Sequence, residues 1–114
     1  MTFVAISVNR EQLALLSRFL VTIFPGCTIY QGSDPMRALL RLSNQKVEAV
    51  FADADTCANM MDTLSKHNGN TQICLLCKQD AVPQEETTNF NGVVSYPITE
   101  QKIRTTLQGI AKAM

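Results

Sequence analysis

The chain has 114 residues, of which 46% are hydrophobic and 18% are charged, so we expect a single globular domain over residues 1–114 with an apolar core. Ten basic residues balance ten acidic ones, and the lysines and arginines are scattered, which argues against nucleic acid or an anionic membrane as a partner. The longest apolar segment is too short for a membrane span and the amino terminus does not resemble a signal peptide, so we expect a cytoplasmic protein with free cysteines.

The apolar residues alternate between short runs and helical spacing, which is typical of a parallel sheet covered by helices on both faces. We expect strands near residues 2–8, 27–31, 47–53, 71–77 and 92–96. A helix follows the first strand, since Asn9 can cap it, Gln12 can reach back to the cap, and Pro25-Gly26 ends it.

Two further helices are predicted from their caps. Asp34 followed by Pro35 is typical of a helix start, because the carboxylate accepts backbone hydrogen bonds and proline fits the first helical position. The apolar side of this second helix is expected to comprise Met36, Leu39, Leu40 and Leu42. A third helix can be capped by Asp55 or Thr56, and its inward residues would be Met60, Met61 and Leu64.

The carboxyl-terminal part has one weak and one strong helix signal. Segment 78–91 has almost no apolar stripe and several poor helix formers, so we expect one or two helical turns or a loop there. Thr99 is a good cap for the last helix, in which Ile103 and Leu107 recur on one face.

Asp53 ends an apolar run (VEAVFAD, residues 47–53) that predicts a strand buried on both faces. The carboxyl edge of an open parallel sheet is where ligands and chemistry usually lie. Asp53 and Asp55 form a D-x-D pair that could hold a divalent ion, so both are weak metal candidates. We favour the alternative, in which these carboxylates cap a helix or are held by helix N–H groups.

Cys74 and Cys77 match the C-x-x-C spacing found in redox and zinc sites. Residues three apart in a strand point to opposite faces, so the two sulfurs cannot meet unless the chain turns between them. We therefore expect no redox or zinc site here, and no cofactor elsewhere in the chain.

The order of elements, the Ala38-Leu39 pair, the strand ending in Asp53 and the segment from Gly92 to Pro97 (GVVSYP) together resemble the CheY-like receiver domain of bacterial response regulators, over essentially the whole chain. The resemblance implies a flavodoxin-like (βα)5 fold, α/β in class, with an open five-stranded parallel sheet in the order 2-1-3-4-5. Within that fold, the weak signal of segment 78–91 predicts that helix four is short or absent. It also implies that Asp53 stands at the phosphoacceptor position and that Tyr96–Pro97 is a candidate cis peptide bond.

The residues that receivers place around the phosphoacceptor are changed in this chain. The family's acidic pair after strand one is matched by Val8 and Asn9, its threonine or serine after strand four by Cys77, and its lysine before Pro97 by Tyr96. Magnesium binding depends on oxygen ligands with negative charge, and phosphoryl transfer depends on cations near the phosphoryl oxygens. We therefore expect a degenerate pseudo-receiver that is not an enzyme and whose Asp53 is not phosphorylated.

Such a module would act in two-component signal transduction by contact with a partner protein or a second copy. The expected surface is strand five with the last helix, around Ile103, Arg104 and Leu107, or the first helix. One alternative is a functional phosphorelay receiver phosphorylated on Asp53, as part of a longer transcription regulator. The other is a Toprim-like metal-dependent phosphodiester enzyme, whose glutamate after strand one is matched poorly by Glu11.

Overall fold

The computed structural model describes residues 1–57, 71–78 and 92–108. Its strands are parallel and form a sheet in the order β2-β1-β3-β4-β5, which confirms the predicted order. The strands are β1 (Thr2–Ile6), β2 (Thr28–Gly32), β3 (Ala49–Asp53), β4 (Gln72–Lys78) and β5 (Gly92–Tyr96). All five lie where the apolar runs predicted them, within one or two residues at most of their ends.

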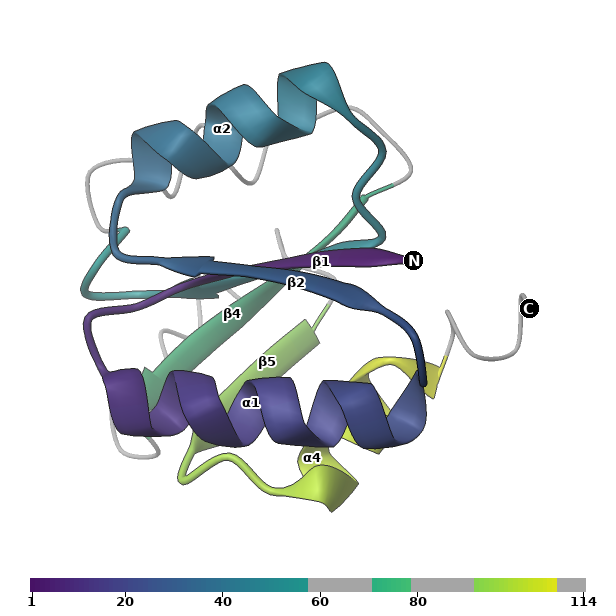
Figure 1. The fold of residues 1–114 in the computed structure, drawn as a ribbon. Helices are drawn as coiled ribbons and strands as arrows, with labels where there is room; N and C mark the ends of the chain where they lie inside the picture. Colours follow the sequence, from purple (N-terminus) through teal and green to yellow (C-terminus); the bar gives the residue numbers. More distant parts are fainter. Residues whose placement is uncertain (58–70, 79–91, 109–114) are drawn as a thin grey trace.

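Helices α1 (Arg10–Ile23) and α4 (Glu100–Thr106) cover one face of the sheet, and α2 (Pro35–Asn44) covers the other (Figure 1). The predicted third helix, with Met60, Met61 and Leu64, and the predicted short helix or loop at 78–91 lie outside the described residues, apart from Lys78 at the end of β4. None of the helices in the described ranges has the length and apolar composition needed to cross a bilayer.

Each strand contributes alternate side chains to two separate cores, because successive residues of a strand point to opposite faces. The core beneath α1 and α4 contains Phe3, Ala5, Ala49, Phe51, Cys74, Leu76 and Val94. The core beneath α2 contains Val4, Ile6, Val50, Ala52, Ile73 and Leu75. Cys74 and Cys77 are both buried, and their strand positions place them on opposite faces, as the spacing predicted.

Three of the predicted helix caps, Asn9, Asp34 and Thr99, are confirmed. Asn9 accepts a hydrogen bond from the Gln12 N–H at 3.2 Å, Asp34 accepts one from Met36 at 3.0 Å, and Thr99 accepts one from Lys102 at 3.3 Å. The prediction that the Gln12 side chain reaches back to the cap is wrong. Its Oε1 instead accepts a hydrogen bond from the Ile98 N–H at 2.9 Å, which ties α1 to the segment after β5.

The predicted apolar side of α2 is only partly correct. Ala38 and Leu42 are buried against the sheet, whereas Met36 and Leu40 are 58% and 60% exposed. The physical reason is the position of α2 beside β2, which is an edge strand, so that only a narrow stripe of the helix meets the sheet.

Gly92 begins β5 at a point where α4 comes very close to the sheet. A Cβ atom added at Gly92 would lie 2.6 Å from Cγ2 of Thr106, a contact too short for real carbon atoms. Glycine is therefore required here by the approach of a neighbouring side chain.

We predict that Gly92→Ala lowers the free energy of unfolding by about 1–3 kcal/mol, the usual range for overpacking. Thr106→Ser removes the obstructing Cγ2 and should recover most of this loss in the double variant. Urea denaturation of the four proteins measures both effects. The matched control is Gly32→Ala, where the added Cβ meets nothing within 4 Å; an equal loss in both alanine variants would contradict the prediction.

Candidate functional site

The candidate site lies at the carboxyl ends of β1, β3 and β5, where Asp53 is surrounded by hydrogen-bond donors. The pairing of Ile6 with Ala52 puts Ser7 level with Asp53. Ser7 Oγ donates to Asp53 Oδ2 at 3.1 Å. The Tyr96 hydroxyl reaches across the intervening strand β4 and donates to the same oxygen at 2.5 Å.

The other carboxylate oxygen of Asp53 is held by the backbone that follows β3. Asp53 Oδ1 accepts hydrogen bonds from the N–H groups of Asp55 and Thr56, at 2.9 Å and 3.0 Å. The Cys57 N–H in turn donates to the Asp53 carbonyl at 2.9 Å, as in the first turn of a helix. This geometry matches the interpretation that we favoured, a carboxylate held by backbone N–H groups. The helix that Asp55 or Thr56 was expected to cap lies outside the described residues.

The charge of Asp53 is stabilised by hydrogen bonds. The side chain is only 7% exposed, and this burial raises the carboxyl pKa. The hydrogen bonds from Tyr96, Thr56, Ser7 and Asp55 act in the opposite direction and prevail, so the pKa lies below its usual value. Burial and the contact with Asp53 also raise the pKa of Tyr96, so its hydroxyl stays protonated and remains a donor.

Ser7 is the residue that the sequence analysis missed, since it contacts Asp53 one position earlier in the chain than the predicted pair of Val8 and Asn9. The Val8 side chain is 72% exposed, and the Asn9 side chain caps α1. The physical reason is that β1 ends at Ile6, two residues earlier than expected. The alternation of Phe3, Ala5 and Ser7 on one face was the signal that could have identified Ser7.

The thiols beside Asp53 are neutral. Cys77 is 4% exposed, and its pKa is raised by burial and by the charges of Asp53 and Asp55. Burial together with Asp53 raises the pKa of Cys57 to about 12. Neither thiol therefore supplies a thiolate at neutral pH.

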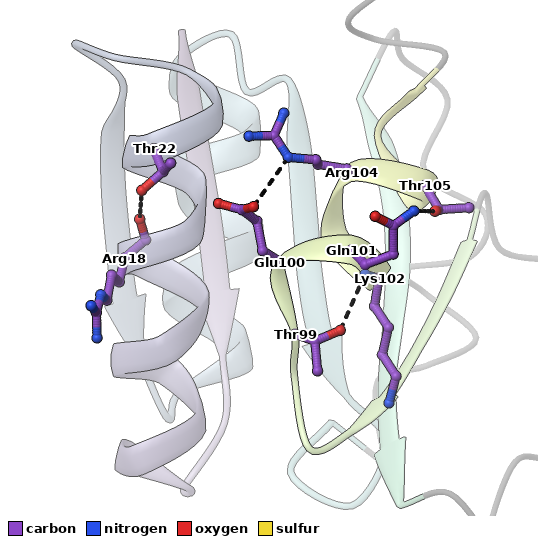
Figure 2. Close-up of polar contacts among 8 residues, drawn as sticks. All are labelled: Arg18, Thr22, Thr99, Glu100, Gln101, Lys102, Arg104 and Thr105. Atoms are coloured by element: carbon purple, nitrogen blue, oxygen red, sulfur yellow. Dashed lines mark hydrogen bonds and ion pairs between the residues drawn. The ribbon is translucent and has the colours of Figure 1, made fainter.

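The Tyr96–Pro97 peptide bond is cis, which confirms the prediction. A lysine lies next to this bond, and Figure 2 shows it on α4. The Lys102 ammonium donates to the Ser95 carbonyl at 3.0 Å, to Ser95 Oγ at 3.2 Å and to the Pro97 carbonyl at 3.0 Å. An ammonium group has three N–H donors, so these bonds account for all of them.

The residues around Asp53 do not fit a magnesium ion. Within the described ranges no group of three or more His, Cys, Asp or Glu side chains is placed to hold a metal. A carboxylate offers about four acceptor positions, and Asp53 already accepts four hydrogen bonds from the protein. Ser7, the neighbour from β1, is neutral and contributes no charge to offset a dication.

Of the three α4 residues expected on the interaction surface, two are buried and one is exposed. Ile103 is 0% and Leu107 is 1% exposed, so both belong to the core beneath α1 and α4 and cannot contact a partner. Arg104 does lie on the surface, where it forms an ion pair with Glu100 at 3.4 Å (Figure 2). The helical spacing of Ile103 and Leu107 therefore marked the buried side of α4.

The chain matches no protein-family model, and no curated protein matches it in sequence. Its structure is similar to the signal receiver domain of a DNA-binding response regulator from Colwellia psychrerythraea 34H, with a TM-score of 0.79, 15% identity and 98% of each chain covered. It is also similar to the receiver domain of a two-component response regulator from Bacteroides fragilis, with a TM-score of 0.77, 16% identity, and 96% of this chain and 95% of that chain covered. A CheY-like receiver domain from Methylobacillus flagellatus gives a TM-score of 0.75 at 15% identity, with 96% of each chain covered.

These similarities, together with the strand order, show that the chain has the flavodoxin-like fold of CheY-like receiver domains. The predicted fold is confirmed.

We predict that the Tyr96 hydroxyl stabilises the protein through the charge on Asp53. Tyr96→Phe should lower the free energy of unfolding at neutral pH by about 1.5–3 kcal/mol, the range for a hydrogen bond to a charged group. Because the Asp53 pKa is lowered on folding, this stabilisation is full above the unfolded pKa of about 3.9 and is lost as the pH falls through the folded value.

Urea denaturation at neutral and acidic pH measures this difference. The matched control is Tyr30→Phe on β2, which should show no pH-dependent loss of this kind. A Tyr96→Phe deficit that stays constant from neutral to acidic pH would show that the hydroxyl does not act through the carboxylate.

Proposed function

We propose that this chain is an atypical receiver, a cytoplasmic signalling module that acts through contact with a protein partner and does not depend on phosphorylation of Asp53. The observation that carries the proposal is the closed carboxylate, with both oxygens of Asp53 bound by donors of the protein itself. The receiver fold supports a role in signalling, and the changed site supports independence from phosphorylation.

The chemistry of phosphoryl transfer explains why the closed site would be unreactive. Asp53 Oδ2 could attack phosphorus only after losing its bonds to Ser7 and Tyr96, and a hydrogen bond to a charged group is worth about 1.5–3 kcal/mol. The reaction also requires that the attacking oxygen and the phosphorus be held in line, and that cations stabilise the charge on the phosphoryl oxygens. Here the neutral hydroxyl of Tyr96 occupies the position that lysine fills in the resembled family, and each ~1.4 kcal/mol of lost stabilisation slows the reaction tenfold.

The exposed polar face of α1 and α4 supports the proposed contact with a partner. Figure 2 shows polar side chains of both helices on this face, on Arg18 and Thr22 of α1 and on Glu100, Gln101, Arg104 and Thr105 of the α4 segment. The two arginines are exposed, and the ion pair of Arg104 with Glu100 is about half exposed on both sides. An exposed pair of this kind contributes little to stability, so these charges are free to serve recognition.

We predict that acetyl phosphate with Mg²⁺ adds no phosphoryl group to the unaltered protein. Intact-mass spectrometry would detect such a group as a gain of about 80 daltons. A stoichiometric adduct on Asp53 would contradict the proposal and would favour a functional phosphorelay receiver.

A restored variant tests the physical reason. Ser7→Asp combined with Val8→Asp and Tyr96→Lys supplies two carboxylates and one cation at the edge of the sheet, and it should gain a magnesium-dependent adduct. Adding Asp53→Asn to that variant is the matched control and should abolish the adduct. A folded restored variant without any adduct would show that these three positions do not account for the lost reactivity.

We predict that charge reversal on the α1–α4 face abolishes partner binding. In pull-downs from cells that express the protein, the double variant Arg18→Glu/Arg104→Glu should lose a protein that the unaltered chain and Asp53→Asn both retain. Both arginines are exposed, so the variant should fold normally, with a change in stability of about 0.5 kcal/mol or less.

The matched control is Arg37→Glu, which reverses a charge on α2 at the other face of the sheet. Retention of the partner by the double variant, or its loss from Asp53→Asn, would contradict the proposal.

A further inference from the structure

A second site lies on the opposite face of the sheet from the α1–α4 surface. A cavity of about 500 Å³ opens between α2 and the strands β1 and β2. Its lining includes Val4 and Ile6 of β1, Tyr30 and Gly32 of β2, and Arg37 and Arg41 of α2. The volume falls within the range of about 300–1,000 Å³ that is common for sites of small organic ligands.

Arg41 is the most informative residue of the cavity. Its Cζ atom lies 3.5 Å from the centroid of the Tyr30 ring, and both side chains are half-buried. Among the described residues the Arg41 guanidinium forms no ion pair and no hydrogen bond. It is held in place by its stacking on the Tyr30 ring. Five N–H donors are thus held in a fixed orientation without a protein acceptor, which is an arrangement suited to an anion with several oxygens.

A second guanidinium lies one turn earlier on the same side of α2. Arg37 also lines the cavity, and its nearest acid is Asp34, with Nε and Oδ2 3.9 Å apart. Asp34 is itself engaged as the cap of α2 through the N–H of Met36. The carboxylate is therefore partly satisfied, and the two guanidinium groups leave an excess of positive charge at the cavity mouth.

The floor of the cavity has a different character. Val4, Ile6 and Ala38 line the floor from the sheet and from α2, each at most 4% exposed. Gln31, Ser33 and Asp34 add polar groups to the lining. Gly32 leaves further space, because a Cβ atom at this position would meet nothing within 4 Å. Cationic groups at the mouth and apolar groups at the floor match a ligand that carries an anionic group at one end of an apolar body.

We propose that this cavity binds a small organic phosphate with an aromatic body, of about the size of a nucleoside monophosphate. Arg41 and Arg37 bind the phosphate, and Asp34, which lines the same cavity and pairs with Arg37, offsets one of the two positive charges. The aromatic body lies against the apolar floor. The proposal does not depend on the state of Asp53 and stands or falls separately from the proposed function.

The test is a titration of the ¹⁵N-labelled protein with adenosine 5′-monophosphate, followed by NMR. The expected result is that amide signals of β2 and α2 shift, and that adenosine and inorganic phosphate each bind at least about tenfold more weakly, because each lacks one half of the ligand. Arg41→Gln should weaken binding by about tenfold or more, since it removes the guanidinium charge.

Arg104→Gln on α4 is the matched control and should leave the affinity unchanged. Gly32→Leu is a second variant, which fills the cavity at a position with open space and should block binding while the protein stays folded. The proposal is overturned if binding is weaker than a dissociation constant of about 10 mM. It is equally overturned if adenosine binds as tightly as its monophosphate, or if Arg41→Gln and Gly32→Leu bind as the unaltered chain does.

Discussion

The arrangement of the carboxyl edge of the sheet depends on how the buried charge of Asp53 is compensated. A carboxylate that is 7% exposed must be stabilised by ions or by hydrogen bonds, because leaving it unpaired would be strongly destabilising. This chain uses four neutral donors, two hydroxyls and two backbone N–H groups. The same four bonds that make the charge tolerable also occupy the oxygens that a metal ion or a phosphoryl group would need.

The closed carboxylate links segments that are far apart in sequence. Ser7 donates to Asp53 while its own Oγ accepts the Asn9 N–H at 3.0 Å, so the turn between β1 and α1 is tied to β3. Tyr96 ties β5 to the same point, and the bond from Ile98 to Gln12 connects the following segment back to α1. Asp53 therefore connects the carboxyl ends of β1, β3 and β5, and a change in its charge would alter hydrogen bonds to all three strands.

Most of the fold followed from local patterns, whereas contacts between distant segments did not. The buried run ending in Asp53 and the caps Asn9, Asp34 and Thr99 were readable because each depends on its own neighbours in sequence. Ser7 was missed because its role depends on the register of β1 against β3. Ile103 and Leu107 were wrongly assigned to a surface, because the spacing of apolar residues on a helix does not show whether they face a core or a partner.

The α1–α4 surface and the cavity beneath α2 lie on opposite faces of the sheet (Figure 1). This separation bears on how a ligand in the cavity would control the module. A ligand shifts a conformational equilibrium only by its difference in affinity between the two states. If Asp53 is not phosphorylated, as we propose, this difference in affinity must come from contacts elsewhere. The cavity beneath α2 meets that condition, since a phosphate bound by Arg37 and Arg41 would hold α2 against the edge strand β2, where only a narrow stripe of the helix is buried.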